Sequence, residues 1–394
     1  MSKTDPLKFK ALRDLKRPAF AADLTDRERD ILRLIRDEGP MSRAALIRTS
    51  GLTGPAIFRA TEDMASKGLL QIGAPIAAGR GQPSHEVKLN PDAAYTLGIS
   101  VMTDRAQAVI MDMTGAIRAS ADITAEGMKR SDILDKAALF LEDQCQQGLN
   151  PRAFVGTGLA LAAFFVKDQT LNPAEPLNDW ALVDLYQPLE AAFSLPTLIE
   201  NSASAAAVGE SLLGVGRHTP SFAYVNFAAG FGGGIILDRR LWRGQTGNAG
   251  EFAAILNAIG AFVPNLESLR SELSDKGIQT EDLQDLVTRF DVAWPGVETW
   301  IAKAAPSIRL LSRIIIETID VGTIVIGGRI PPSLAERLAV AARITQAELD
   351  AVQRRHRGRP APKIIAAEAD ARATAIGAAA LPMSRFIFTP PHLR

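Results

Sequence analysis

The sequence predicts two structural units of different class, a small and mainly helical unit at the N-terminus and a larger α/β unit behind it. The first ninety residues contain short runs with helical periodicity and helix-cap signals, whereas strands alternate with helices from residue 96 onward. The charge also changes sign. Residues 1–90 hold 16 Lys and Arg against 11 Asp and Glu, and the remaining residues hold 28 against 33. We therefore expect domains over 1–90 and 91–394.

Three helices are predicted in the N-terminal unit. LTDRERDILRLIRDEGP predicts the first, because Thr25 can cap it and Glu28, three residues on, completes a capping box. MSRAALIRTSG predicts a second helix between the cap Ser42 and the terminator Gly51. LTGPAIFRATEDMASKGLL predicts a third, with Thr53 as its cap. The tight Ser-Gly-Leu-Thr joint between the last two is typical of a helix-turn-helix.

Two apolar runs, 69–72 and 85–89, flank a Gly/Pro-rich loop and predict a β-hairpin. Together with the helices, the hairpin predicts a winged helix-turn-helix whose third helix enters the major groove of DNA. Arg80 in GRGQP is expected to reach a narrow minor groove. The candidate DNA contacts are Thr53, Gly54, Ala56, Phe58, Arg59, Arg80 and Gln82.

Two alternatives stay open for this unit. The Phe58 side chain could meet a thymine methyl group or pack against the wing, and the sequence favours neither. The whole unit could also be a protein-interaction module. The capped helices, the positive charge and the arginine in the wing favour DNA.

Strands and helices alternate in the rest of the chain. TLGISV, AQAVIMDM and GAIRASADI predict a β-meander, and SDILDKAALFLEDQCQQ predicts an amphipathic helix capped by Ser131. SFAYVNFAAGFGGGIILDRRLWRG predicts a strand, a glycine turn and a second strand, and GTIVIGG and PKIIAA predict later strands. This order predicts an α/β chain of two similar lobes, each opening with meandering strands.

Cysteine content and hydropathy restrict the class of protein. Cys145 is the single cysteine, so neither an intrachain disulfide nor a cysteine-based metal site can form. No apolar run reaches membrane-spanning length, and the first residues do not resemble a signal peptide. We expect a cytoplasmic protein without a membrane segment, a metal or a cofactor.

Several segments also match a known pattern in their order and spacing. They are GRGQPSHEVKLNPDAAYTLGI, IENSASAAAVGE, FAAGFGGGIILDRRLWRGQTGNAGE, and TIVIGG with the closing AIGAAAL. On these segments the chain resembles the ROK family of repressors, open reading frames and sugar kinases, in its transcriptional-regulator branch with an N-terminal winged helix-turn-helix. The resemblance implies an actin-like (ribonuclease H-like), two-lobed sugar-kinase fold with a sugar cleft between the lobes.

Measured against this family, the chain lacks the residues of phosphoryl transfer. Where the kinases read Asp-x-Gly-Gly-Thr, the chain reads GISVMTDR, with Ser100 for the acid and Met102 and Thr103 for the glycines. Ala229 replaces the threonine of the second phosphate loop. Ser202 stands where the kinases carry the aspartate that acts as general base, and a serine hydroxyl is far too weak a base. We therefore expect no catalytic residues and no enzyme activity.

The resemblance implies ligand contacts at Asn201, Glu251, Asn178 and Asp179. Asn201 could hydrogen-bond a sugar hydroxyl, or simply cap the helix that follows, and the two roles are compatible. Glu251 in AGEFAAI matches the glutamate of Gly-Glu-x-Gly-His, whereas Ala254 replaces the histidine. No cysteine cluster follows, so the structural zinc of the family is expected to be absent.

These observations favour a transcriptional regulator, a repressor of carbohydrate-metabolism genes that senses a sugar in a non-catalytic cleft. Its expected partners are an inverted-repeat operator in double-stranded DNA and a small carbohydrate effector, and the chain is expected to form a homodimer or homotetramer. Two alternatives remain. One is a sugar kinase with an added DNA-binding domain, and the other is a regulator whose cleft binds no small ligand and docks a protein.

Overall fold

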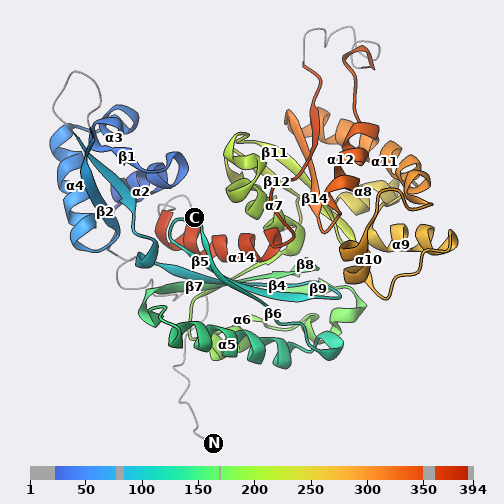
Figure 1. Cartoon of the computed structure of the whole chain (residues 1–394), viewed down its shortest axis with the longest axis horizontal. Helices are drawn as coiled ribbons and strands as arrows, with labels where there is room; N and C mark the ends of the chain where they lie inside the picture. Colours follow the sequence, from blue (N-terminus) through green and yellow to red (C-terminus); the bar gives the residue numbers. More distant parts are fainter. Residues whose placement is uncertain (1–22, 77–83, 168–169, 349–359, 389–394) are drawn as a thin grey trace, which may run out of the picture.

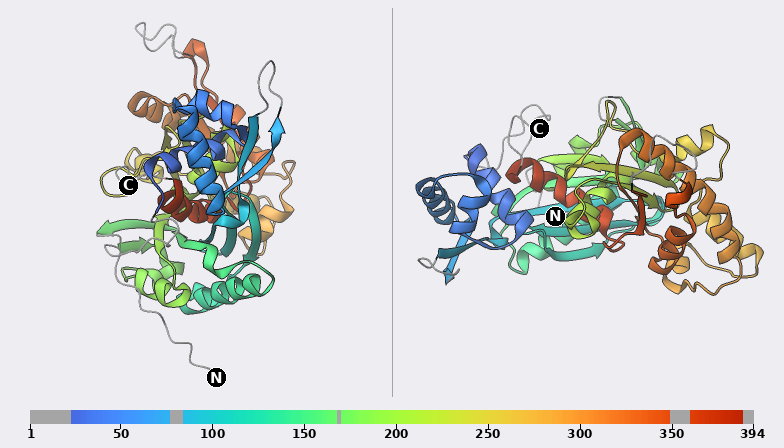
Figure 2. Two further views of the ribbon diagram at one scale, coloured as in Figure 1. Left: turned by 90° about the vertical axis from the view of Figure 1, so that its left-hand side faces the viewer. Right: turned by 90° about the horizontal axis from the view of Figure 1, so that it is seen from above.

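The computed structural model describes residues 23–76, 84–167, 170–348 and 360–388. A small N-terminal unit lies at one end of the long axis, and the helices of the second of two sheet-based lobes lie at the other end (Figure 1, Figure 2). Among the described residues, no helix is both long and apolar enough to span a membrane.

The N-terminal unit combines three helices with a three-stranded antiparallel sheet. The helices are α2 (Asp26–Glu38), α3 (Arg43–Ser50) and α4 (Gly54–Ser66), and the sheet has the order β1 (Met41–Ser42), β3 (Ser84–Leu89), β2 (Leu70–Ile76). The predicted capping box of α2 is confirmed, because Thr25 and Glu28 cap each other reciprocally. Ser42 caps α3 by accepting a hydrogen bond from Ala45 N.

Three local predictions need correction. Thr53 occupies the cap position of α4 but makes no side-chain capping bond. The hairpin strands cover 70–76 and 84–89 rather than 69–72 and 85–89. Helix α5 (Arg130–Gln146) is not capped by Ser131, since it starts one residue earlier. Its first N–H is bound from outside, because the Asp179 carboxylate accepts a hydrogen bond from Arg130 N at 2.7 Å.

The first lobe is built on a five-stranded sheet. Its order is β10 (Thr197–Asn201), β7 (Phe154–Leu161), β4 (Tyr95–Val101), β5 (Ala106–Asp112), β6 (Ile117–Asp122). Strands β4, β5 and β6 form the predicted meander, and β7 and β10 run parallel to β4. Helices α5 and α6 (Tyr186–Phe193) cover its outer face. A two-stranded ribbon of β8 (Ala163–Lys167) and β9 (Thr170–Pro173) follows β7.

The second lobe repeats this strand arrangement. Its sheet order is β13 (Arg240–Leu241), β12 (Phe231–Leu237), β11 (Phe222–Phe227), β14 (Thr323–Gly328), β15 (Lys363–Ala366). Here too, three antiparallel strands are followed by two strands parallel to the first. The helices of this lobe are α8 (Phe252–Ala258), α9 (Leu266–Asp275), α10 (Leu283–Arg289), α11 (Val297–Ile319) and α12 (Pro332–Ala341). The prediction of two similar lobes, each opening with a meander, is confirmed.

Two helices of small residues, α7 (Ser202–Leu213) and α14 (Ala373–Met383), lie between the two sheets (Figure 1). Their approach leaves no space for a side chain at several glycines. A Cβ atom at Gly377 of α14 would lie 1.7 Å from Ala205 O of α7, and one at Gly158 of β7 would lie 1.8 Å from Ala378 O. The packing of this layer therefore depends on glycine at these positions.

The N-terminal unit is joined to the end of α14. The buried Arg29 side chain of α2 donates hydrogen bonds from Nη1 to the carbonyl oxygens of Phe386 and Ile387, the latter at 2.9 Å. The Arg36 guanidinium lies 4.4 Å from the ring centroid of Phe388. Phe386, Ile387 and Phe388 all belong to η8 (Ser384–Phe388), a short turn of π-helix. One apolar cluster also spans both units, so the boundary at 90/91 stays a prediction.

We predict that Gly158→Ala destabilises the protein by about 3 kcal/mol or more, because the added methyl group meets a backbone carbonyl that cannot rotate away. The matched control is Gly322→Ala, since a Cβ atom there meets no heavy atom within 4 Å. This variant should change the free energy of unfolding by less than about 1 kcal/mol. Urea denaturation measures the free energy of unfolding of both variants. Equal values for Gly158→Ala and Gly322→Ala would contradict the tight packing of the helix layer.

Candidate functional site

The side chain of Asn201 joins the end of β10 to the start of α7 and to β8. Its Oδ1 atom accepts hydrogen bonds from Ala203 N at 2.7 Å and Ser204 N at 3.2 Å, so Asn201 caps α7. Its Nδ2 atom donates to Ala163 O at 2.6 Å. Ser202, which was expected not to act as a general base, is buried in the first turn of α7. Asn201 therefore has a structural role, and this role leaves room for a ligand contact.

Glu251 lies directly before α8 and is partly buried. Burial raises the pKa of its carboxyl above the ordinary value. Among the described residues, the carboxylate has no hydrogen bond or ion pair and does not cap α8. The preceding Gly250 has a φ of 100°, and a Cβ atom there would lie 2.5 Å from Gly233 O. The backbone before Glu251 is thus held tightly against β12, while its carboxylate is left for another partner.

Strand β8 connects the segments that carry Asn201 and Glu251. Asn201 bonds to the backbone of β8 at Ala163, as described above. Phe165 lies two residues further along β8. Its N–H donates a hydrogen bond to Asn248, and its carbonyl oxygen accepts one from Asn248, both at 2.8 Å. Asn248 belongs to the loop that leads to Glu251. The structure therefore brings the end of β10 and this second-lobe loop to one short strand.

A second region of the cleft lies where β4, β11 and β14 end. Arg329 follows β14 and is buried, and its Nη1 atom donates to Asp104 Oδ1 at 2.6 Å. Its Nη2 atom donates to Gln284 Oε1 at 3.2 Å. Asp104 follows β4 in the first lobe, whereas Arg329 and Gln284 belong to the second, so this contact holds the two lobes together.

The cavity beside this ion pair is very small. It has a volume of about 10 Å³, and its lining includes Ser100, Met102, Ala228 and Arg329. This volume is close to that of a single water. The part of the chain that the structure describes contains no cluster of three or more His, Cys, Asp or Glu residues placed to hold a metal.

Five of the predicted DNA contacts lie on or directly before α4. Thr53 and Arg59 are exposed, and Gly54 and Ala56 are partly exposed. Phe58 is 54% exposed, and the Arg43 guanidinium of α3 lies 4.7 Å from its ring centroid. A third arrangement thus appears beside the two predicted ones, a cation–π contact that leaves most of the ring in solvent. Arg80 and Gln82 lie outside the described residues.

Comparison with known proteins adds the family. Residues 96–263 match the model of the ROK family. These residues are a ROK family domain.

Relatives of known sequence extend the match beyond the domain. An uncharacterised protein of Sinorhizobium fredii is 26% identical over 374 residues, covering 93% of both chains. The xylose repressor of Bacillus subtilis is 26% identical over 226 residues, covering 56% of this chain and 58% of the repressor. The match to this repressor thus spans less than two thirds of its length.

Solved structures show the fold. A ROK family transcriptional regulator, described as a homologue of the E. coli MLC protein, has a TM-score of 0.62 at 20% identity and covers 92% of this chain and 96% of its own. A ROK family glucokinase from Streptomyces griseus, in complex with glucose and AMPPNP, has a TM-score of 0.54 at 20% identity, covering 73% and 99%. The expected actin-like, two-lobed sugar-kinase fold is confirmed.

Two predicted ligand residues of the ROK domain lie in the short helix η5 (Glu175–Trp180). Asp179 binds the start of α5 through its carboxylate, and its carbonyl oxygen accepts a hydrogen bond from Arg130 Nη1 at 2.8 Å. Asn178 is exposed. Trp180 is fully buried, and its Nε1 atom donates a hydrogen bond to Met128 O. No described contact joins Asn178 or Asp179 to Asn201 or Glu251.

Sequence reasoning did not identify three residues that join the two lobes: Asn248, Asp104 and Arg329. Asn248 stands three residues before Glu251 in GQTGNAGE, so its place beside a predicted ligand residue was the available signal. Asp104 follows the altered phosphate loop GISVMTDR, and Arg329 follows the glycine pair of TIVIGG. Nothing local in the sequence indicates that these two, which stand 225 positions apart, form an ion pair.

We predict that Glu251→Gln stabilises the folded protein by about 1 kcal/mol at neutral pH, because it removes a partly buried charge without a described partner. Burial raises the pKa of Glu251 in the folded state, so the ionised carboxylate disfavours folding. The advantage of glutamine should therefore vanish as the pH falls through this raised pKa toward the unfolded value of 4.5. Thermal unfolding between pH 4 and 8 measures it, with the exposed Glu175→Gln as control. Equal behaviour of both variants would contradict the prediction.

Proposed function

We propose that the protein is a sequence-specific transcriptional repressor of carbohydrate-metabolism genes, with a ROK domain that binds a sugar without phosphorylating it. The observation that carries the proposal is the combination of an N-terminal helical unit, within residues 1–90 that hold an excess of Lys and Arg, with a ROK domain whose altered phosphate loop GISVMTDR pairs with Arg329 through Asp104. The similarity to a xylose repressor supports the same function.

In this proposal the N-terminal unit, residues 1–90, is a winged helix-turn-helix. Helices α3 and α4 meet at the tight joint between Ser50 and Gly54, and β2 and β3 form the hairpin that would be the wing. Helix α4 offers exposed side chains at its N-terminal end, where a recognition helix contacts base edges. A homodimer or homotetramer would present two such units to an inverted repeat. Arg80 and Gln82 remain proposed contacts of the wing.

The sugar would bind where β8 meets the end of β10 and the loop that carries Glu251. The Glu251 carboxylate is held by a rigid backbone and lacks a described partner, which suits an acceptor for sugar hydroxyls. Asn201 is already bonded to α7 and β8, so a ligand hydroxyl would add to an ordered amide group. Asn178 and Asp179 would serve as outlying contacts.

A path of packed elements supports regulation of DNA binding from this cleft. The helix α7 begins at Asn201, packs against α14 without intervening side chains, and α14 continues into η8. The turn η8 then receives the Arg29 hydrogen bonds of α2. A shift of α7 on ligand binding would therefore be transmitted to the N-terminal unit, since close-packed interiors do not absorb displacement locally.

Two alternatives are separated by direct assays. The glucokinase neighbour keeps a kinase function open, but a kinase requires a general base and space for a nucleotide phosphate. Ser202 provides no base, and the 10 Å³ cavity provides no such space. ATP-dependent phosphorylation of a common sugar would support the kinase. Absence of any carbohydrate-induced change in melting temperature would support a protein-docking cleft.

We predict that Arg59→Ala weakens binding to an operator selected from a random duplex pool by about tenfold or more, because it removes an exposed cation from the proposed recognition helix. If the lost contact is to phosphate, the slope of log affinity against log salt falls by about 1. Arg337→Ala is the control, because Arg337 is exposed and pairs with Glu298 on the second lobe. Similar losses in both variants would contradict a specific role of α4.

We predict that Glu251→Gln abolishes the response of operator binding to the effector sugar while leaving operator affinity unchanged without it. The reason is that a neutral amide accepts weaker hydrogen bonds from sugar hydroxyls than a carboxylate does. The effector is first found by thermal-shift screening of carbohydrates, and operator titrations follow with and without it. Glu175→Gln is the control. A variant that is more stable than the parent and still responds fully would exclude Glu251 as a ligand contact.

A further inference from the structure

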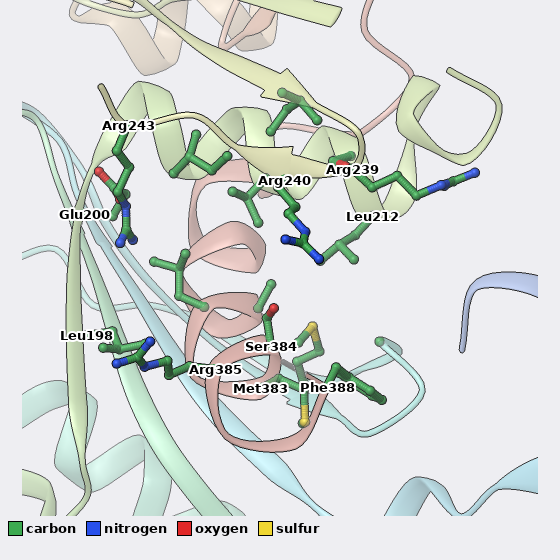
Figure 3. A pocket seen from close by; sticks show the side chains of 18 of the residues that line it. Leu198, Glu200, Leu212, Arg239, Arg240, Arg243, Met383, Ser384, Arg385 and Phe388 are labelled. Carbon is green, nitrogen blue, oxygen red and sulfur yellow. The ribbon is translucent and has the colours of Figure 1, made fainter. Parts of the chain in front are cut away.

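A large pocket lies where the N-terminal unit meets the two lobes, and it shares β8, β10 and the loop after β13 with the proposed sugar site. Its volume is about 1230 Å³, above the range of about 300–1,000 Å³ that is usual for small-molecule sites. It is bounded by the end of α2, by β10, by β13 with the loop that follows it, and by η8 (Figure 3). Glu200 lines this pocket, whereas its strand neighbour Asn201 and Glu251 do not, since successive residues of a strand face opposite sides.

The charge of the pocket is strongly positive. Its lining includes six arginines but only three carboxylates, namely Arg36, Arg217, Arg239, Arg240, Arg243 and Arg385 against Asp37, Glu38 and Glu200. Two of the carboxylates are already neutralised from within the lining. Arg243 Nε lies 2.6 Å from Glu200 Oε2, and Arg36 Nη2 lies 2.9 Å from Asp37 Oδ1. Arg217, Arg239 and Arg240 stand against one remaining carboxylate, Glu38, so the lining carries a surplus of positive charge.

Two of these arginines reach into the pocket from opposite walls. Figure 3 shows the guanidinium of Arg240 extending from β13 into the space and that of Arg385 extending from η8 toward Leu198. Arg240 is exposed and has no hydrogen bond or ion pair among the described residues. Arg239 is oriented differently, because its Nη1 atom donates to Gly216 O at 2.9 Å. Arg240 is thus the arginine most available to an incoming anion.

The rest of the lining is largely apolar, with contributions from Leu198, Leu212, Ile236, Leu241, Met383 and Phe388. Cationic groups above an apolar surface fit a ligand that has an anionic head and an apolar body. Residues 1–22 do not fit this description, because they hold six Lys and Arg against two Asp and Glu. Charge complementarity therefore favours an external anion.

We propose that this pocket is a second ligand site, which binds a small organic anion with a phosphate or carboxylate head group on an apolar body. The head group binds Arg240 and Arg385, and the body packs on the apolar wall. Because the end of α2 and the turn η8 both line the pocket, the bound anion contacts the N-terminal unit and the ROK domain at once.

The test uses the full-length protein and three probes of matched shape. Phenyl phosphate and phenylacetate carry the two head groups, and benzyl alcohol carries none. Isothermal titration calorimetry should detect binding of at least one of the anions, weakened by added salt, and no binding of the alcohol. The stronger of the two anions identifies the head group. Binding of neither anion, or equal binding of benzyl alcohol, overturns the proposal.

Variants locate the site. Arg240→Ala should weaken binding of the anion at least tenfold, Arg240→Glu should abolish it, and Arg240→Lys should retain most of it. Arg240 is exposed, so these variants should fold like the parent, which their melting temperatures verify. Arg337→Ala controls for general loss of positive charge, and Glu251→Gln should bind the anion like the parent. Unchanged binding in Arg240→Glu, or lost binding in Arg337→Ala, places the anion elsewhere and overturns the proposal.

Discussion

The contact of α7 with α14 is the constraint on which the rest of the structure depends. Both helices lie between the two sheets, and glycines at Gly158, Gly209 and Gly377 let backbone meet backbone where any side chain would intrude. Small side chains predominate where the two helices face each other, so the stability of this contact comes from dense packing of many small groups. The two lobes and the N-terminal unit are all attached to this layer, which makes it the common element of every proposed motion.

Much of the fold could be predicted from local sequence, because its signals are local. The caps of α2 and α3, the meanders and the closing helix each depend on residues only a few positions apart. The start of α5 was misplaced because its first N–H is bound by Asp179, which is distant in sequence. Thr53 was assigned a capping bond because position and residue type suggest one, although its side chain does not make it.

The candidate site was predictable only in outline. The family pattern led to Asn201 and Glu251, and β8 connects their two segments. The residues that join the two lobes, Asn248, Asp104 and Arg329, form contacts between elements far apart in the chain, and such contacts leave no periodic or spacing signal. The arginine-lined pocket could not be predicted for the same reason. Its walls come from α2 near the N-terminus, from the middle of the chain and from η8 near the C-terminus.

The ion pair of Arg329 and Asp104 also bears on how such a protein can change over evolutionary time. Removing either partner alone leaves a charge in a buried or partly buried place. For a fully buried pair that loss is about 3–5 kcal/mol, a large share of the stability of an ordinary domain. Substitution of one partner alone therefore passes through a less stable protein, so these two positions, 225 residues apart in the chain, are expected to change together.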